Sequence, residues 1–108
     1  MKIVIAGAGE VGNHLAKLFC NEDHDVILMD SDENKLRKAA TNYDLMTVTG
    51  SVSSIEDLKT AQVSGCDLFI AVPPYEEVSI LSAMLAKKLG AKKTIARINN
   101  YEYLQPEN

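Results

Sequence analysis

A glycine-rich segment near the N-terminus has the spacing of a site for dinucleotide phosphates. Residues 7–12 read Gly-Ala-Gly-Glu-Val-Gly, a complete GxGxxG pattern directly after a short apolar run. In this pattern the first glycine allows a tight turn, the second lets a pyrophosphate approach the backbone, and the third permits close packing of helix on strand. The alternative is a tight turn without a ligand. The candidate cofactor-binding residues are Gly7, Gly9, Glu10, Val11 and Gly12.

An acidic residue follows at about the distance expected for a contact with ribose. Asp30 lies 18 residues after Gly12, close to the roughly 20 typical of such sites. A carboxylate there accepts both ribose hydroxyls and repels a 2′-phosphate, and Ser31 is followed by two further acids instead of a neutralising arginine. NAD or NADH is therefore favoured over NADP, with Asp30 and Ser31 as contacts. The alternative is that Asp30 only caps the helix that starts near Asp32.

Two further charged residues bear on the phosphates. Glu10, between the second and third glycines, would repel a third phosphate, so ATP should bind less tightly than a dinucleotide. ADP and ATP remain alternative ligands because they share the adenosine half of the site. A solvent-facing Glu10 is the other interpretation. Arg97, at the end of the fifth apolar run, would reach a phosphate or an acidic partner, or form a structural ion pair.

The rest of the chain alternates between two patterns. Short apolar runs at 3–6, 26–29, 45–48, 68–72 and 95–98 are separated by segments with helical spacing of apolar residues. This order predicts one α/β domain over residues 1–108, a Rossmann-like doubly wound parallel sheet with strand order 3-2-1-4-5. Ligands of such sheets bind beyond the carboxyl ends of the strands, where strands 1 and 4 meet. The last crossover and sixth strand of a full Rossmann domain are expected to be truncated.

Three local signals mark helix boundaries. Ser53 and Glu56 have the spacing of a capping box, and Gly90 stands where the fourth helix should end. Pro73-Pro74 allows that helix only after itself. The fourth helix has apolar residues on more than one face, which predicts a second buried surface and pairing of domains; packing within one domain is the alternative.

Composition excludes several classes of function. The net charge is −4 and the basic residues form no cluster longer than a pair, so nucleic acid is not an expected partner. No apolar run approaches the roughly 20 residues of a membrane helix, and no secretory signal is present. Cys20 and Cys66 lack zinc spacing and are expected to be reduced structural thiols. His14 and His24 are expected on the surface, so we predict no catalytic residue and no metal site.

Several segments together resemble the TrkA N-terminal domain, also called the RCK or KTN domain. They are Met1–Gly12, Val26–Asp30, Gly50, Cys66–Val72 and the Ala-Arg-Ile-Asn-Asn-Tyr run at 96–101. Members of that family are cytosolic NAD-binding regulatory subunits of bacterial Trk potassium-uptake systems, or gating rings of related channels. The resemblance implies a membrane potassium transporter subunit as partner, homo-oligomers such as dimers or rings, and a cytoplasmic location at the inner face of the plasma membrane.

The resemblance also implies further contacts with a dinucleotide. Gly50 and Ser51 would lie beside the adenine, Val72 and Pro73 would pass under the pyrophosphate or the nicotinamide ribose, and Arg97 would face the phosphates. We therefore expect a regulatory nucleotide-binding module whose ligand shifts domain assembly and gates potassium flux. The alternatives are the cofactor half of an NAD-dependent dehydrogenase and a protein-interaction domain without nucleotide.

Overall fold

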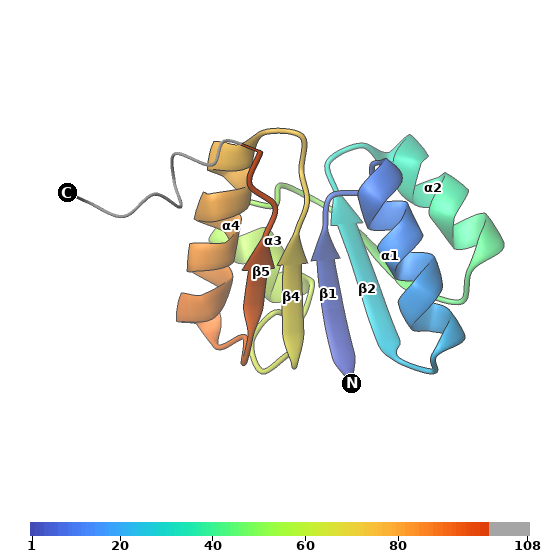
Figure 1. The fold of residues 1–108 in the computed structure, drawn as a ribbon, viewed down its shortest axis with the longest axis horizontal. Helices are drawn as coiled ribbons and strands as arrows, with labels where there is room; N and C mark the ends of the chain where they lie inside the picture. The colour runs from blue at the N-terminus through green and yellow to red at the C-terminus, as the bar shows by residue number, and fades with distance from the viewer. Residues whose placement is uncertain (100–108) are drawn as a thin grey trace.

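The protein alternates strands and helices along its length (Figure 1). The computed structural model describes residues 1–99, apart from the side chain of Asn42. The elements are β1 (Lys2–Ala6), α1 (Glu10–Asn21), β2 (Asp25–Asp30), α2 (Glu33–Asn42), β3 (Met46–Thr49), α3 (Ile55–Thr60), β4 (Leu68–Ala71), α4 (Glu76–Leu89) and β5 (Thr94–Ala96). The predicted α/β class is confirmed.

The strands form one parallel sheet with the order β3-β2-β1-β4-β5, as predicted. All carboxyl ends therefore lie along one edge, which is the upper edge in Figure 1. Strand β1 pairs with β2 on one side and with β4 on the other, so the direction in which strands are added reverses at β1. The carboxyl ends of β1 and β4 therefore form the switch point, where doubly wound sheets bind ligands.

Both faces of the sheet are buried, which explains why the inner strands are nearly continuous apolar runs. Val4 packs with Phe69 and with Leu58 of α3 in a core that also includes α4. Ile5 belongs to the opposite core, which includes Leu36 of α2 and part of α1. Successive residues of one strand thus anchor different pairs of helices, and the central strand β1 is held from both sides.

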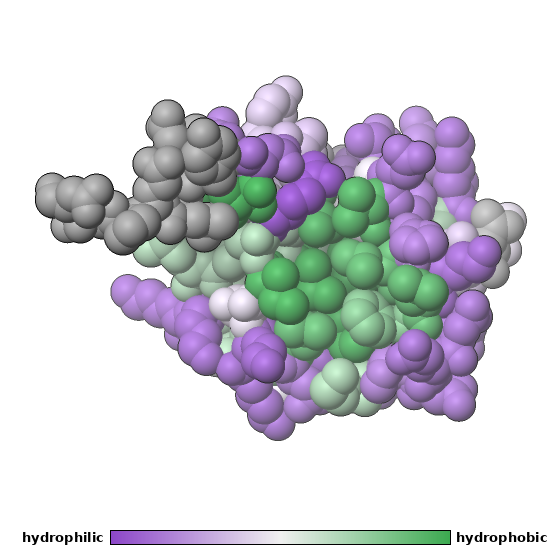
Figure 2. Space-filling view, viewed as in Figure 1, coloured by the Kyte–Doolittle hydropathy of each residue, from purple (hydrophilic) through white to green (hydrophobic). Residues whose placement is uncertain are grey.

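One part of the α1 and α2 face carries no helix within residues 1–99. No described helix lies in front of β4 and β5 in Figure 1, and Figure 2 shows a continuous hydrophobic surface on this side of the molecule. Ile95 pairs with Ile70 of the core beneath α1, so its side chain lies on the same face, where it is 49% exposed. The predicted truncation of the last crossover concerns the chain beyond residue 99, which lies outside the described residues.

Helix α4 packs against the sheet with small side chains rather than large ones. Its buried residues are Ser79, Ser82, Ala83 and Ala86, whereas Leu81 and Met84 are 46% and 65% exposed. The apolar surplus predicted from the sequence is therefore present on the outside of the helix. The predicted end of this helix is also confirmed, because Gly90 adopts the left-handed conformation with φ of 113°.

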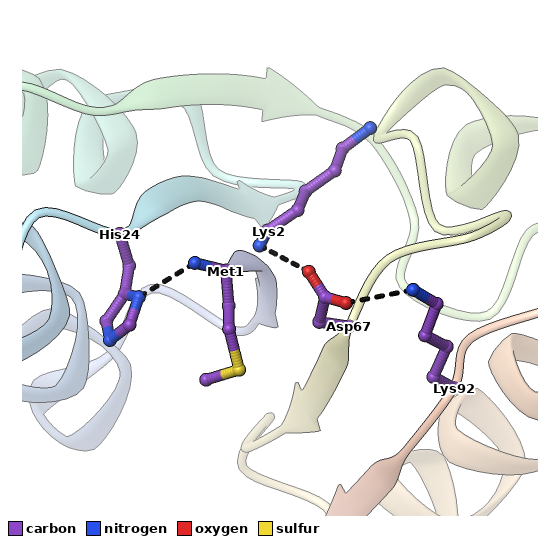
Figure 3. Close-up of polar contacts among 5 residues, drawn as sticks. All are labelled: Met1, Lys2, His24, Asp67 and Lys92. Carbon is purple, nitrogen blue, oxygen red and sulfur yellow. Dashed lines mark hydrogen bonds and ion pairs between the residues drawn. The ribbon is translucent and has the colours of Figure 1, made fainter.

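A polar cluster joins the amino ends of the strands (Figure 3). The Asp67 carboxylate accepts a hydrogen bond from the Lys2 backbone amide at 2.8 Å and pairs with Lys92 Nζ at 3.1 Å. The Lys2 amide contributes most and the Lys92 ammonium next, and together they hold the pKa of Asp67 below its ordinary value. This contact links β1 to the segments that precede β4 and β5.

His24 belongs to the same end of the sheet and corrects one expectation. Its side chain is only 21% exposed, its ring meets Phe19 edge to face with centroids 5.9 Å apart, and its Nδ1 lies 3.0 Å from the α-amino nitrogen of Met1. The prediction of a surface residue is wrong here because the aromatic contact covers the ring. His14 is exposed on α1, as expected.

The Asp67 contacts make stability depend on pH. Because the folded pKa is lower than the unfolded pKa, the carboxylate stabilises the fold above the unfolded pKa, and this is lost as the pH falls through the folded pKa. Asp67→Asn should therefore lower the free energy of unfolding at about pH 7, with the difference shrinking below about pH 4. Urea titrations across this range measure it, with Asp44→Asn as an exposed control of equal charge change. A difference from the wild type that is independent of pH would contradict the assignment.

Candidate functional site

The turn after β1 is shaped by two glycines that admit no side chain. Gly7 has φ of +114°, and a Cβ on it would lie 2.8 Å from the Val72 carbonyl carbon and oxygen. A Cβ on Gly12 would overlap the Gly7 carbonyl oxygen. The packing roles predicted for these two glycines are therefore confirmed. Nothing lies within 4 Å of a Cβ placed on Gly9, so the backbone there is open to a molecule approaching from outside.

The first turn of α1 is left open for an anion. Gly9 is the residue before the helix and provides no side-chain cap, and its carbonyl accepts the first helical hydrogen bond, from Asn13 N at 2.9 Å. The first amides of any helix have no partner within the helix and carry its positive dipole end. The Glu10 and Val11 side chains of this turn are exposed.

Asp30 is the last residue of β2, and its side chain contacts the glycine turn. Its Oδ2 accepts the Ala8 amide at 2.8 Å and its Oδ1 accepts the Asp32 amide at 2.8 Å. The cap of α2 is Asp32, whose carboxylate accepts from Asn34 N, so Asp30 is not the helix cap. A carboxylate has about four lone-pair positions, and two contacts leave capacity for the two hydroxyls of a ribose.

The loop after β3 is held by an acidic residue that sequence reasoning missed. The Asp57 carboxylate accepts the Ser51 amide at 2.8 Å, and a Cβ on Gly50 would lie 2.8 Å from the Asp57 carboxyl carbon. Gly50 in turn donates its amide to the Asp30 carbonyl at 3.0 Å. The side chain of Asp57 therefore fixes the loop that the resemblance places beside an adenine.

The capping box predicted for the same region is wrong by one residue. α3 begins after Ser54, whose hydroxyl accepts from Asp57 N at 3.2 Å. The Asp57 carboxylate turns toward Ser51 instead of completing the box. Ser53 instead belongs to a turn, in which its amide donates to the Ser51 hydroxyl at 3.3 Å. This turn moves the start of the helix one residue along the chain.

The loop after β4 closes the other side of the turn. Val72 donates its amide to the Ala6 carbonyl at 2.8 Å, and both Val72 and Pro73 are buried. Arg97 Nη2 donates to the Pro73 carbonyl at 3.2 Å from the neighbouring strand end. The guanidinium thus lies at the carboxyl end of the sheet, and the contact that the structure gives it is to backbone.

These loops enclose a cleft of about 420 Å³ at the switch point. Five of the residues predicted from the sequence line it: Gly7, Asp30, Ser31, Ser51 and Pro73. The other predicted residues adjoin the cleft through the contacts described above or form the open first turn of α1. The lining residues not predicted are Asp32, Lys35, Val52, Ser53, Pro74, Tyr75 and Val78. Of these, the sequence singles out Asp32 for its charge, and Ser53 and Pro74 as helix-boundary signals, but none of them as a residue of the cleft.

The described residues show neither a metal-binding cluster nor a membrane-spanning helix. Residues 1–99 contain no cluster of His, Cys, Asp or Glu suited to a metal ion. Cys20 and Cys66 are free thiols, and burial raises the pKa of both. No described helix has both the length and the apolar character needed to cross a membrane. A second cleft of about 560 Å³ lies at the opposite end of the strands, beside His24 and Lys2.

Solved structures with the same fold include nucleotide-binding and dehydrogenase chains. The Kef CTD of Shewanella denitrificans in its AMP-bound form superposes with a TM-score of 0.78 at 19% identity, covering 96% of this chain and 65% of that one. A 3-hydroxyacyl-CoA dehydrogenase from Archaeoglobus fulgidus gives a TM-score of 0.65 at 19% identity, covering 88% of this chain and 33% of that one. At these identities the likeness establishes the Rossmann-type fold alone.

Relatives by sequence are more specific. A Trk system potassium uptake protein TrkA homolog from Archaeoglobus fulgidus is 41% identical over 96% of this chain, which spans 23% of that protein. A homolog of the same name from Methanothermobacter thermautotrophicus is 34% identical over 95% of this chain and 48% of that protein. The chain thus spans about a quarter to a half of these relatives. Residues 3–106 match the model of the TrkA-N domain, an NAD-binding domain, and the chain therefore belongs to the TrkA-N family.

Proposed function

We propose that this chain is the regulatory NAD(H)-binding module of a Trk-type potassium-uptake system. The observation that carries the proposal is the contact between Asp30 and the glycine turn, which brings a ribose-binding carboxylate beside an uncapped helix start at the switch point of the sheet. Phosphate and ribose of one nucleotide need these two groups side by side. The names of the relatives supply the transport system.

The adenosine and pyrophosphate parts of a dinucleotide have counterparts among the residues in and beside the cleft. In this assignment the open amides of the first turn of α1 bind the pyrophosphate, and Asp30 accepts the adenosine ribose hydroxyls. The Ser51 loop lies beside the adenine, and Arg97 faces the phosphates from the β5 side. The proposed contacts are Gly7, Gly9, Glu10, Val11, Gly12, Asp30, Ser31, Gly50, Ser51, Val72, Pro73 and Arg97.

Charge around the cleft ranks the nucleotides. Asp30 and Asp32 line the cleft with one lysine, Lys35, and the two carboxylates outnumber that ammonium in opposing the 2′-phosphate of NADP. Glu10 is exposed at the start of α1, where a third phosphate would extend, so ATP should bind less tightly than NAD or NADH. ADP and AMP avoid both repulsions, and they offer the same adenosine half.

Asp30 provides the direct test of the site. NAD and NADH should bind more tightly than NADP and ATP, and Asp30→Asn should weaken NADH binding by about ten- to a hundredfold, because a charge-assisted hydrogen bond contributes about 1.5–3 kcal/mol. Asp30→Ala should have a similar effect on binding and leave the domain folded, since the side chain lies at the cleft and outside the core. Isothermal titration calorimetry measures the affinities.

The matched control for that test is Glu33→Gln. Glu33 is exposed on the first turn of α2, does not line the cleft, and loses the same charge on substitution. Its affinity for NADH should equal that of the wild type. Equal or stronger binding of NADP, or an unchanged NADH affinity in Asp30→Asn, would remove Asp30 from the ribose site.

The dehydrogenase alternative rests on the fold. Its support is the likeness to chains such as the 3-hydroxyacyl-CoA dehydrogenase, and the fold alone does not carry an activity. Within residues 1–99 neither histidine lines the cleft, so the described part offers no imidazole as a base beside a nicotinamide. The relatives' names favour regulation over catalysis.

We further propose that domains pair through the outer face of α4. Leu81 and Met84 are exposed there, beside a groove of about 560 Å³ lined by Ile80, Ala83 and Ile98 among others. Large apolar side chains that lie together on the surface are typical of protein interfaces. Pairing here would leave the nucleotide cleft open.

A charge placed on this face tests the pairing. Met84→Glu should weaken self-association by about tenfold or more, because a carboxylate at the interface would be desolvated. Leu18→Glu, at a 44% exposed apolar position on α1, is the control and should associate like the wild type. Light scattering over a concentration series reports both. A monomeric wild type, or dissociation by Leu18→Glu alone, would contradict pairing through α4.

Regulation requires a further step that the isolated domain does not perform. A ligand shifts an assembly only when its affinities for two arrangements differ, so we propose that NAD and NADH favour different arrangements beneath a membrane potassium transporter. The domain would then lie at the inner face of the plasma membrane, attached through that partner and with no insertion of its own. Its net charge of −4 argues against nucleic acid as a competing partner.

Potassium flux tests this last step. In the full-length protein with its transporter, flux should differ between NAD and NADH. Asp30→Asn should reduce that difference because weaker binding lowers the occupancy of both ligands at a fixed concentration. Rubidium uptake into proteoliposomes at fixed nucleotide concentration measures the effect, with Glu33→Gln as the control. Identical flux with every nucleotide that the protein binds would exclude gating by nucleotide.

A further inference from the structure

Tyr75 is an unusual residue for its position at the start of α4. It occupies the position before the first turn of α4 and makes no side-chain cap, where Ser, Thr, Asp or Asn is normally preferred. The corresponding residues of α2 and α3, Asp32 and Ser54, do cap their helices. Its ring is 65% exposed. Neither capping nor burial therefore accounts for an aromatic residue here, and such local conflicts concentrate at functional sites.

The ring is attached to a well-fixed part of the cleft. Tyr75 lines the cleft together with Pro74 and Val78, and its carbonyl accepts the amides of Val78 at 3.1 Å and Ser79 at 3.0 Å. The preceding prolines have no backbone amide and a fixed φ. The backbone that carries the ring is thus already ordered, so placing the ring on a ligand restricts only the two side-chain torsions.

The same cleft contains the groups assigned to the adenosine half of a nucleotide. Asp30, Ser31 and Ser51 line it with Tyr75, whereas Arg97, on the far side of Pro73, does not. Pro74 and Val78 add apolar surface, and the Ser51 loop supplies polar groups. A planar base held beside a ribose on Asp30 would therefore meet the phenol ring rather than the β5 side of the sheet.

We propose that the Tyr75 ring stacks on the adenine base of the bound nucleotide and closes the cleft over it. This rests on the proposed nucleotide site and specifies its base contact. Stacking needs only a π face, so the ring should raise the affinity for AMP, ADP and NADH by the same factor. The phenol hydroxyl plays no part, and phenylalanine should replace tyrosine.

Calorimetry with AMP and NADH on the wild type and three variants tests the assignment. Tyr75→Ala should lower the affinities for AMP and NADH by the same factor, about tenfold or more. The affinities of Tyr75→Phe should stay within about twofold of those of the wild type. Met46→Ala, at an exposed apolar position on β3 outside the cleft, is the control and should bind normally. Circular dichroism and urea titration show that each variant is folded.

Fluorescence supplies a readout that a structural role would not change. The chain has four tyrosines and no tryptophan, so AMP should quench part of the tyrosine emission of the wild type and less of the emission of Tyr75→Phe, at equal occupancy. If the wild type binds neither AMP nor NADH, the nucleotide site itself is wrong. If it binds both and Tyr75→Ala does so equally well, or loses NADH alone, stacking on adenine is excluded.

Discussion

The contact between the backbone of Gly7 and the Val72–Pro73 peptide determines the geometry of the whole cleft. At this point β1 and β4 end side by side, and a Cβ on Gly7 would come within 2.9 Å of the Pro73 nitrogen. Gly12 lies against the Gly7 carbonyl on the other side, so α1 starts directly over β1. The two loops and the helix thus approach one another closely at these glycines, with the Val72 side chain beside Gly12. Any residue larger than glycine would separate the glycine turn from the loop that carries Pro74 and Tyr75.

Asp30 links the glycine turn to the loops that follow β2 and β3. Its carboxylate accepts amides from the glycine turn and from the start of α2, and its carbonyl accepts the Gly50 amide. One residue therefore ties β1, β2 and β3 together at the edge where a ligand would bind. The same charge that organises the loops is the charge that a ribose would meet, so a substitution here acts on loop structure and on recognition together. Because each carboxylate oxygen accepts one backbone amide, the affinity of an Asp30 variant is interpreted beside its free energy of unfolding.

The sequence predicts most of the fold because its signals are local and agree with one another. The glycine spacing, the doubly buried strands and Gly90 each act over a few residues, and the strand order follows from the handedness of the crossovers. What it does not predict depends on tertiary partners. Ser82 is buried because its hydroxyl donates to the Val52 carbonyl at 2.6 Å, 30 positions away, and Asp57 faces Ser51 only once the β3–α3 turn has formed.

The helix starts divide into two classes, and the division follows the site. α2 and α3 begin with polar side chains that accept their first amides, whereas α1 and α4 have no side-chain cap. The two uncapped helices are those that follow β1 and β4, the strands that flank the switch point. Unsatisfied amides lower the stability of a helix, and a phosphate at α1 would satisfy them. A ligand that binds only the folded state stabilises it by mass action. Nucleotide binding would therefore raise the free energy of unfolding and offset the missing cap of α1.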